Sequence, residues 1–138
     1  MRDKIVSIAR RYVGTPYRHQ GRSAQGLDCV GLIVVIADEL GIDCKDVPNY
    51  RRRSMGTEFF QAFNNAGCRQ KSLAARLPGD IIILKFGMRA QHAAILTDRN
   101  TIIHAFASTS RSTVIEEHYS QQWIDRSVAC YAFPGVDK

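Results

Sequence analysis

Residues 28–41 read DCVGLIVVIADELG and predict the central helix of the fold. Asp28 is a favourable helix N-cap, and glycine, found here at Gly41, is the residue that most often follows a helix C-terminus. Between these two ends, residues 30–37 are apolar on nearly every side of the helix. A helix of this kind is buried all round. We therefore expect the flanking sequence to supply elements that cover it.

The sequence around this helix predicts further helices followed by strands. Apolar residues at helical spacing predict an N-terminal helix that ends at residues 14–16, and Ser54 can cap a third helix that carries the phenylalanines of residues 59–63. Beyond Gly79, short runs at 81–86, 93–97, 101–106, 112–115 and 128–133 predict strands, with a short helix at 119–123. Short connections favour hairpins. The expected class is α+β, with helices packed on an antiparallel sheet of about five strands.

Composition predicts one soluble domain spanning residues 1–138, because 45% of the 138 residues are hydrophobic and 23% are charged. The longest apolar run, residues 30–37, is far shorter than the roughly 20 residues that span a bilayer, so no membrane insertion is expected. The start, MRDK, lacks the features of a secretory signal, which predicts synthesis in the cytoplasm. A net charge of +6 suits an anionic polymer. It brings no nucleic-acid-binding motif, so nucleic acid is not an expected partner.

The four cysteines, at positions 29, 44, 68 and 130, form no C-x-x-C pair and lie beside no paired histidines, so no metal site is expected. They are also too sparse for a disulfide scaffold. Cys29 differs from the others because it begins the buried helix, where free N–H groups and the helix dipole lower a thiol pKa. Asp28 opposes this as a charge. We predict a nucleophile at Cys29 and small buried apolar residues at the other three positions.

A nucleophilic thiol needs a base, and the base needs an orienting group. Two of the four histidines, His92 and His104, lie in consecutive predicted strands. If residues 98–100 form a three-residue loop, Ala94 pairs with His104, and His92 lies diagonally on the same face at roughly 7–8 Å. A two-residue loop would place the two rings on opposite faces. The sequence Asp-Arg-Asn fits either turn, so both arrangements stay open.

Residues 28–32 (DCVGL), 92–95 (HAAI) and 103–105 (IHA) together resemble the NlpC family of papain-like cell-wall cysteine peptidases. Residues 14–17 (GTPY) and 77–80 (LPGD) match further landmarks of that family, so the resemblance covers almost the whole chain. It implies a papain-like fold and a thiol hydrolase that needs no cofactor. In that enzyme Cys29 is the nucleophile, His92 the base and His104 the orienting residue.

The same resemblance implies that Tyr17 helps to position the oxyanion. In the commoner family pattern an Asp and a Ser around the nucleophile help to recognise the free amino end of the substrate. Asp28 matches the Asp, whereas Val30 replaces the Ser. Family enzymes typically cut between D-γ-glutamate and a diamino acid in peptidoglycan stem peptides. The replacement at Val30 leaves open which bond this chain cuts.

Residues 14–20 (GTPYRHQ) and 131–134 (YAFP) are similar to small peptidases encoded among the tail genes of phages and gene transfer agents. That similarity implies phage tail proteins as partners and delivery to the cell wall by a tail. Two alternatives stay open. One is an acyltransferase or amidase on another substrate, and the other is a catalytically silent tail-assembly protein. The three retained residues Cys29, His92 and His104 argue against the silent protein.

Overall fold

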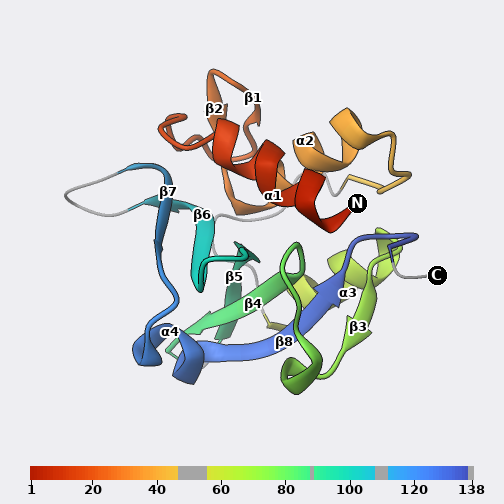
Figure 1. The fold of residues 1–138 in the computed structure, drawn as a ribbon, viewed down its shortest axis with the longest axis vertical. Coiled ribbons are helices and arrows are strands. Elements are labelled where there is room, and N and C mark those ends of the chain that lie inside the picture. Colours follow the sequence, from red (N-terminus) through yellow and green to blue (C-terminus); the bar gives the residue numbers. More distant parts are fainter. Residues whose placement is uncertain (47–55, 88, 108–111, 137–138) are drawn as a thin grey trace.

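The structure is a computed structural model, and it describes residues 1–46, 56–87, 89–107 and 112–136 (Figure 1). Its elements follow the predicted order of helices before strands. They are α1 (Arg2–Arg11), β1 (Arg22–Ser23), β2 (Gly26–Leu27), α2 (Cys29–Leu40), α3 (Gly56–Asn65), β3 (Arg69–Lys71), η1 (Leu73–Ala75), β4 (Ile81–Phe86), β5 (Arg89–Leu96), β6 (Thr101–Ala107), β7 (Ser112–His118), α4 (Gln121–Arg126) and β8 (Ser127–Ala132). The predicted cap of the third helix, Ser54, lies outside the described residues.

The main sheet has six antiparallel strands in the order β3-β8-β4-β5-β6-β7. The α+β class is confirmed. The sequence predicted about five strands and missed β3, which has only three residues, RQK. Such a short polar segment has no alternation of apolar residues that could reveal a strand. It pairs with β8 along Arg69–Lys71, and this backbone pairing alone makes it part of the sheet.

Each face of the sheet packs on its own set of helices. Ile81, Ile83 and Ile95 belong to the large core shared with α1, α2 and α3. The alternate residues, such as Ile82 and Leu84, form a smaller cluster with side chains of η1 and α4. This is the period-two pattern of a strand that is covered on both faces. In Figure 1, α1 and α2 lie together over one side of the sheet, away from α4.

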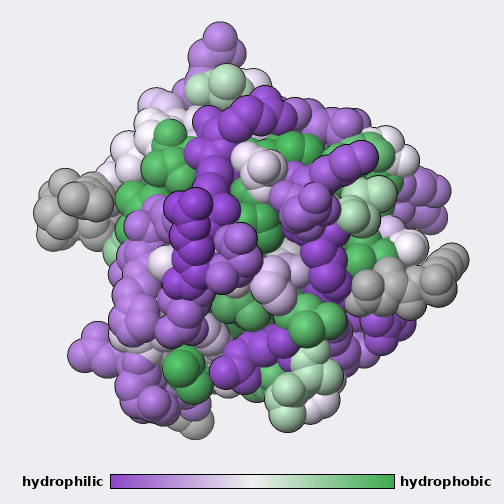
Figure 2. Space-filling model, viewed as in Figure 1, coloured by the Kyte–Doolittle hydropathy of each residue, from purple (hydrophilic) through white to green (hydrophobic). Residues whose placement is uncertain are grey.

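Helix α2 has the ends that its sequence predicts. Asp28 is the N-cap, and Gly41 follows the helix in the left-handed conformation, with φ 67°. Residues 30–37 are all buried. By contrast, α1 buries only one side, through Ile5, Ile8 and their neighbours, and exposes charged residues on the other. Figure 2 shows that hydrophilic side chains predominate on the face that carries α1. Among the described helices, none has the length and apolar character needed to cross a membrane.

The hairpin between β5 and β6 has the three-residue loop that brings the two histidines to one face. Ile95 pairs with Ile103, and Leu96 pairs with Ile102. The Thr97 amide then donates to the Thr101 carbonyl at 3.0 Å, which closes a loop of residues 98–100. Within this loop, Asn100 takes a positive φ of 56°, which is typical of three-residue hairpin loops. The same-face arrangement is therefore confirmed.

Candidate active site

The loop before α2 is tied to the first turn of that helix by Asp28. One carboxylate oxygen of Asp28 accepts from the Gly31 amide at 2.8 Å and from the Arg22 guanidinium at 3.2 Å. The other oxygen accepts from the Gln20 amide at 2.7 Å. Gly31 allows this close approach, since a Cβ there would collide with a loop carbonyl. These contacts give Asp28 a structural role, and substrate recognition by it stays a prediction.

Cys29, the first residue of α2, is partly exposed. Desolvation, and secondly the charge of Asp28, raise the pKa of the Cys29 thiol to about 12. Backbone amides, of which Ala93 contributes most, act in the opposite direction. The prediction that the helix N-terminus lowers this pKa is therefore wrong in its net direction. Desolvation and the adjacent carboxylate outweigh the amides, so the resting thiol is protonated at neutral pH.

The Cys29 thiol meets the sheet where β5 and β6 stop pairing. Within the described residues, these two strands pair only at Ile95–Leu96 with Ile102–Ile103. The Ala93 amide lies just beyond that pairing, and it interacts with the thiol. The helix N-terminus and the sheet therefore meet beside the backbone of residue 93. His92 directly precedes Ala93 in β5, and the predicted approach of its ring to the sulfur stays a prediction.

The two predicted histidines form one hydrogen-bonded chain that ends on a carboxylate. His92 Nε2 lies 2.6 Å from His104 Nδ1, and His104 Nε2 lies 2.7 Å from Glu117 Oε2. Both rings are buried, with 6% of His92 and 0% of His104 exposed. Burial lowers the pKa of His92 well below 6.5, and the charge of His104 adds to this effect. Burial also lowers the pKa of His104, while Glu117 opposes that shift. Both rings are therefore neutral at neutral pH.

Aromatic rings surround the hydrogen-bonded His92, His104 and Glu117. Trp123 in α4 packs edge-on against His104, with ring centroids 5.2 Å apart, and its Nε1 donates to Glu117 Oε1 at 3.1 Å. Phe106 contacts both histidine rings. Sequence reasoning missed Glu117, because it lies beyond the predicted strand 112–115 and follows another glutamate. Once β7 extends to His118, Glu117 lies diagonally across from His104 on the same face, and this parity is the signal that could have found it.

Tyr17 lies next to the loop that leads into α2. Its amide donates to the Ser112 carbonyl at 2.7 Å, and it forms an isolated parallel bridge with Leu27. The side chain packs against the main core. The structure therefore brings the Tyr17 backbone close to the N-terminus of α2. The predicted action of its hydroxyl on the oxyanion stays a prediction.

The other three cysteines lie away from the histidines. Cys44 and Cys68 hydrogen-bond to each other and line an apolar hollow between α2 and α3. Cys130, in β8, is buried and donates to Asp80 at 3.6 Å. Across the described ranges, no group of three or more His, Cys, Asp or Glu residues is placed to hold a metal ion.

Comparisons with known proteins identify relatives of this chain. The model of the NlpC/P60 family matches residues 14–131. The probable endopeptidase NlpC of Escherichia coli (strain K12) is 30% identical over 121 residues, which cover 81% of this chain and 69% of that protein. The NlpC/p60 domain of the peptidoglycan hydrolase SagA aligns with a TM-score of 0.68 at 22% identity, covering 96% of this chain and 99% of that domain. The peptidoglycan hydrolase RipB of Mycobacterium tuberculosis aligns with a TM-score of 0.67 at 17% identity, covering 95% of this chain and 63% of that one. These solved structures share the fold described above.

Proposed function

Because this chain belongs to the NlpC/P60 family of cysteine peptidases and hydrolases, we propose that it hydrolyses amide bonds in the stem peptides of bacterial peptidoglycan. One observation carries the proposal. His92, whose ring lies 2.6 Å from that of His104, directly precedes Ala93, whose amide interacts with the Cys29 thiol. Cys29 is the nucleophile, His92 the base and His104 the orienting residue.

The first step in this proposal is attack by sulfur coupled to proton transfer. His92 uses Nε2 toward His104, so Nδ1 is the nitrogen left to face the thiol. Burial raises the pKa of the Cys29 thiol to about 12 and lowers the pKa of His92, so the resting pair is neutral rather than ionic. The S–H proton therefore moves to His92 Nδ1 as the C–S bond to the carbonyl carbon forms.

The second step collapses the tetrahedral intermediate. Backbone amides at the start of α2 donate to the oxyanion, with the Tyr17 hydroxyl as a further donor. His92 returns its proton to the leaving nitrogen, the C–N bond breaks, and an acyl thioester stays on Cys29. Water then attacks this thioester while His92 accepts the water proton. The products are a free carboxylic acid and the restored thiol.

We propose the bond between D-γ-glutamate and the diamino acid as the site of cleavage, on the basis of the resemblance to the family. Purified peptidoglycan digested with the wild-type protein should yield these new termini by mass spectrometry, and Cys29→Ala should yield none. Parallel digests with added amines distinguish hydrolysis from acyl transfer. Intact peptidoglycan after wild-type digestion would refute the hydrolase.

We also propose that a phage or phage-like tail presents this domain to the cell wall, so that the domain itself needs only weak contact with the polymer. The net charge of +6 supports attraction to an anionic wall. Salt screens this attraction, because the Debye length falls to roughly 10 Å at 0.1 M. Cys29→Ala protein should therefore pellet with purified sacculi weakly, and less as salt rises. Tight binding that salt does not weaken would show a dedicated wall-binding surface and remove the need for a tail.

A further inference from the structure

We propose that Glu117 is a positioning residue that fixes the direction of the hydrogen bonds through His104 and His92. It leaves His92 Nδ1 without a proton and ready to act as the base. The catalytic consequence rests on the proposed function, whereas the hydrogen-bond direction does not. The series of hydrogen bonds begins at the 2.7 Å contact between Glu117 and His104 and continues inward from His104 to His92.

A carboxylate accepts hydrogen bonds and cannot donate them. His104 Nε2 must therefore carry a proton and donate it to Glu117 Oε2. A neutral imidazole has one protonated nitrogen, so His104 Nδ1 is an acceptor. His92 Nε2, 2.6 Å away, must then be the donor in the next bond. This leaves His92 Nδ1 with a free lone pair.

Trp123 makes the position specific for a carboxylate. Its Nε1 donates to Glu117 Oε1 at 3.1 Å, so both carboxylate oxygens accept a hydrogen bond. Glutamine at this position would offer only one oxygen. If that oxygen accepts from Trp123, the amide NH₂ faces His104 and donates to its Nε2. The direction of the hydrogen bond between His104 and His92 is then reversed. His92 Nδ1 would then carry a proton, and it could not accept the thiol proton.

The charge of Glu117, like its hydrogen bonds, favours His92 as the base. When His92 takes the thiol proton, a positive charge develops on the pair of buried rings. Glu117 opposes the burial that lowers the pKa of His104, so its charge favours the protonated pair. The Glu117 side chain is 35% exposed, whereas the His104 side chain is fully buried.

The direction can be tested without any enzyme activity. Nitrogen-15 NMR of the histidines above pH 7.5 should show protons on Nε2 of both His92 and His104 in the wild type. In Glu117→Gln the protons should move toward Nδ1. A wild type with a proton on Nδ1 of either ring would overturn the proposal. If peptidoglycan hydrolysis fails while this tautomer pattern is present, the function is wrong and the positioning role of Glu117 holds.

Activity gives the second test, through a rescue that loss of folding would not produce. Glu117→Gln should lower kcat by about 100-fold or more with little change in KM, since the wrong tautomer disables the base. Adding Trp123→Phe removes the competing N–H and lets the glutamine oxygen face His104. The double variant should therefore recover at least about tenfold over Glu117→Gln. A double variant no better than the single one would overturn the proposal.

Glu116→Gln is the matched control, because it removes the same charge one residue away on the opposite face of β7. Glu116 bonds to Arg10 at 3.2 Å and to Thr101 at 2.6 Å, away from the histidines. This variant should lose some stability but keep the wild-type tautomers and kcat. An equal fall in kcat for both variants would attribute the effect to general loss of charge and overturn the role of Glu117.

Discussion

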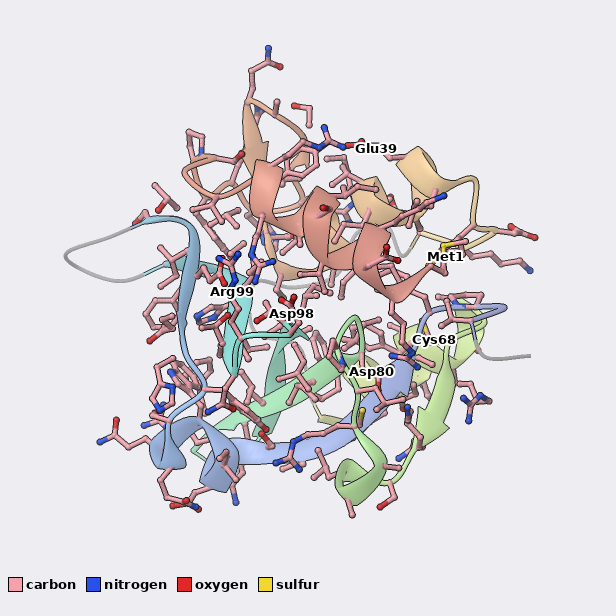
Figure 3. All side chains as sticks on the ribbon, in the orientation of Figure 1. Met1, Glu39, Cys68, Asp80, Asp98 and Arg99 are labelled. Carbon is pink, nitrogen blue, oxygen red and sulfur yellow. The ribbon has the colours of Figure 1, made fainter. Side chains whose placement is uncertain are left out.

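Two buried polar clusters lie at the main sheet, and they differ in how their charge is compensated. In the first, Asp80 is fully buried and its carboxylate binds Arg2 and Lys71, each at 2.8 Å. The Leu77 amide also donates to it, at 2.8 Å. Figure 3 places Asp80 in the space between α1 and the sheet. In this Asp80 cluster, the two cations neutralise the carboxylate by direct contact. The cluster also joins the N-terminal helix to strands far along the sequence.

In the second cluster, the neutral rings of His92 and His104 are buried. The charged group is the partly exposed carboxylate of Glu117, at the outer end of their hydrogen-bond series. His92 and His104 share one short hydrogen bond, and a second one leads to the carboxylate. A proton that enters at His92 therefore meets a prepared counter-charge. Full compensation makes the buried Asp80 carboxylate structural, whereas two neutral rings hydrogen-bonded to a carboxylate can accept a proton.

Replacing the base should have the largest effect. His92→Ala removes the acceptor of the thiol proton, so kcat/KM on soluble wall peptides should fall by about 10⁴-fold. The fold should persist, because the variant also removes a buried polar ring whose charged form is costly. Steady-state kinetics together with urea unfolding test both parts. Activity within tenfold of wild type would mean that the histidine cluster is structural, like the Asp80 cluster.

Breaking the Asp80 cluster should reverse this pattern. Asp80→Ala leaves two cations facing a buried site without their carboxylate, which costs about 3–5 kcal/mol of unfolding free energy. Activity per folded molecule should stay near wild type, because the cluster contacts none of the proposed catalytic residues. Urea unfolding measures the loss, and activity in stabilising osmolyte measures the folded fraction. A loss below 1 kcal/mol would contradict the structural role of the Asp80 cluster.

His104→Ala should have an intermediate effect on catalysis. The orienting residue holds the base and its tautomer but does not exchange the thiol proton itself. We therefore expect kcat to fall by about 10²-fold, less than in His92→Ala. The same peptide assay makes the comparison. If His104→Ala is the more damaging of the two, the order of base and orienting residue must be exchanged.

The smallest expected effect is on stability at acid pH. The pKa values of His92 and His104 in the folded protein lie below 6.5, so the unfolded chain binds more protons just below that pH. Their contribution to stability is complete above pH 6.5 and decreases as the pH falls below it. Each group can contribute a slope of up to about 1.4 kcal/mol per pH unit. Urea unfolding from pH 7.5 to 5.5 should show this slope, and a variant with alanine at both positions should flatten it. An equal slope in that variant would contradict the neutral-ring account.

The sequence predicted the elements with strong periodic patterns and clear ends. Helix α2 was predicted by its apolar run and its two caps, and β4 matches the run 81–86 residue for residue. The parity of His92 and His104 followed from one loop length, although the turn sequence alone could not choose that length. The structure decided it through the left-handed Asn100 and the Thr97–Thr101 hydrogen bond.

Other features could not be read from local sequence, because they depend on distant contacts. The Cys29 pKa is set mainly by desolvation, which no spacing rule contains, so the predicted sign was wrong. Glu117 acquires its role because β7 runs beside β6 and because Trp123 folds back over both. The Asp80 cluster likewise joins Arg2, near the N-terminus, to Lys71 and Asp80, which lie far along the sequence.

Cys29 is the proposed nucleophile, and replacing each of the four cysteines singly with alanine tests this assignment. Digestion of purified peptidoglycan should stop in Cys29→Ala, while the thermal midpoint stays close to wild type. Cys44→Ala, Cys68→Ala and Cys130→Ala should each keep activity per folded molecule, since their thiols lie away from His92. Wild-type rates in Cys29→Ala, or loss of activity in another cysteine variant that remains folded, would rule out Cys29 as the nucleophile.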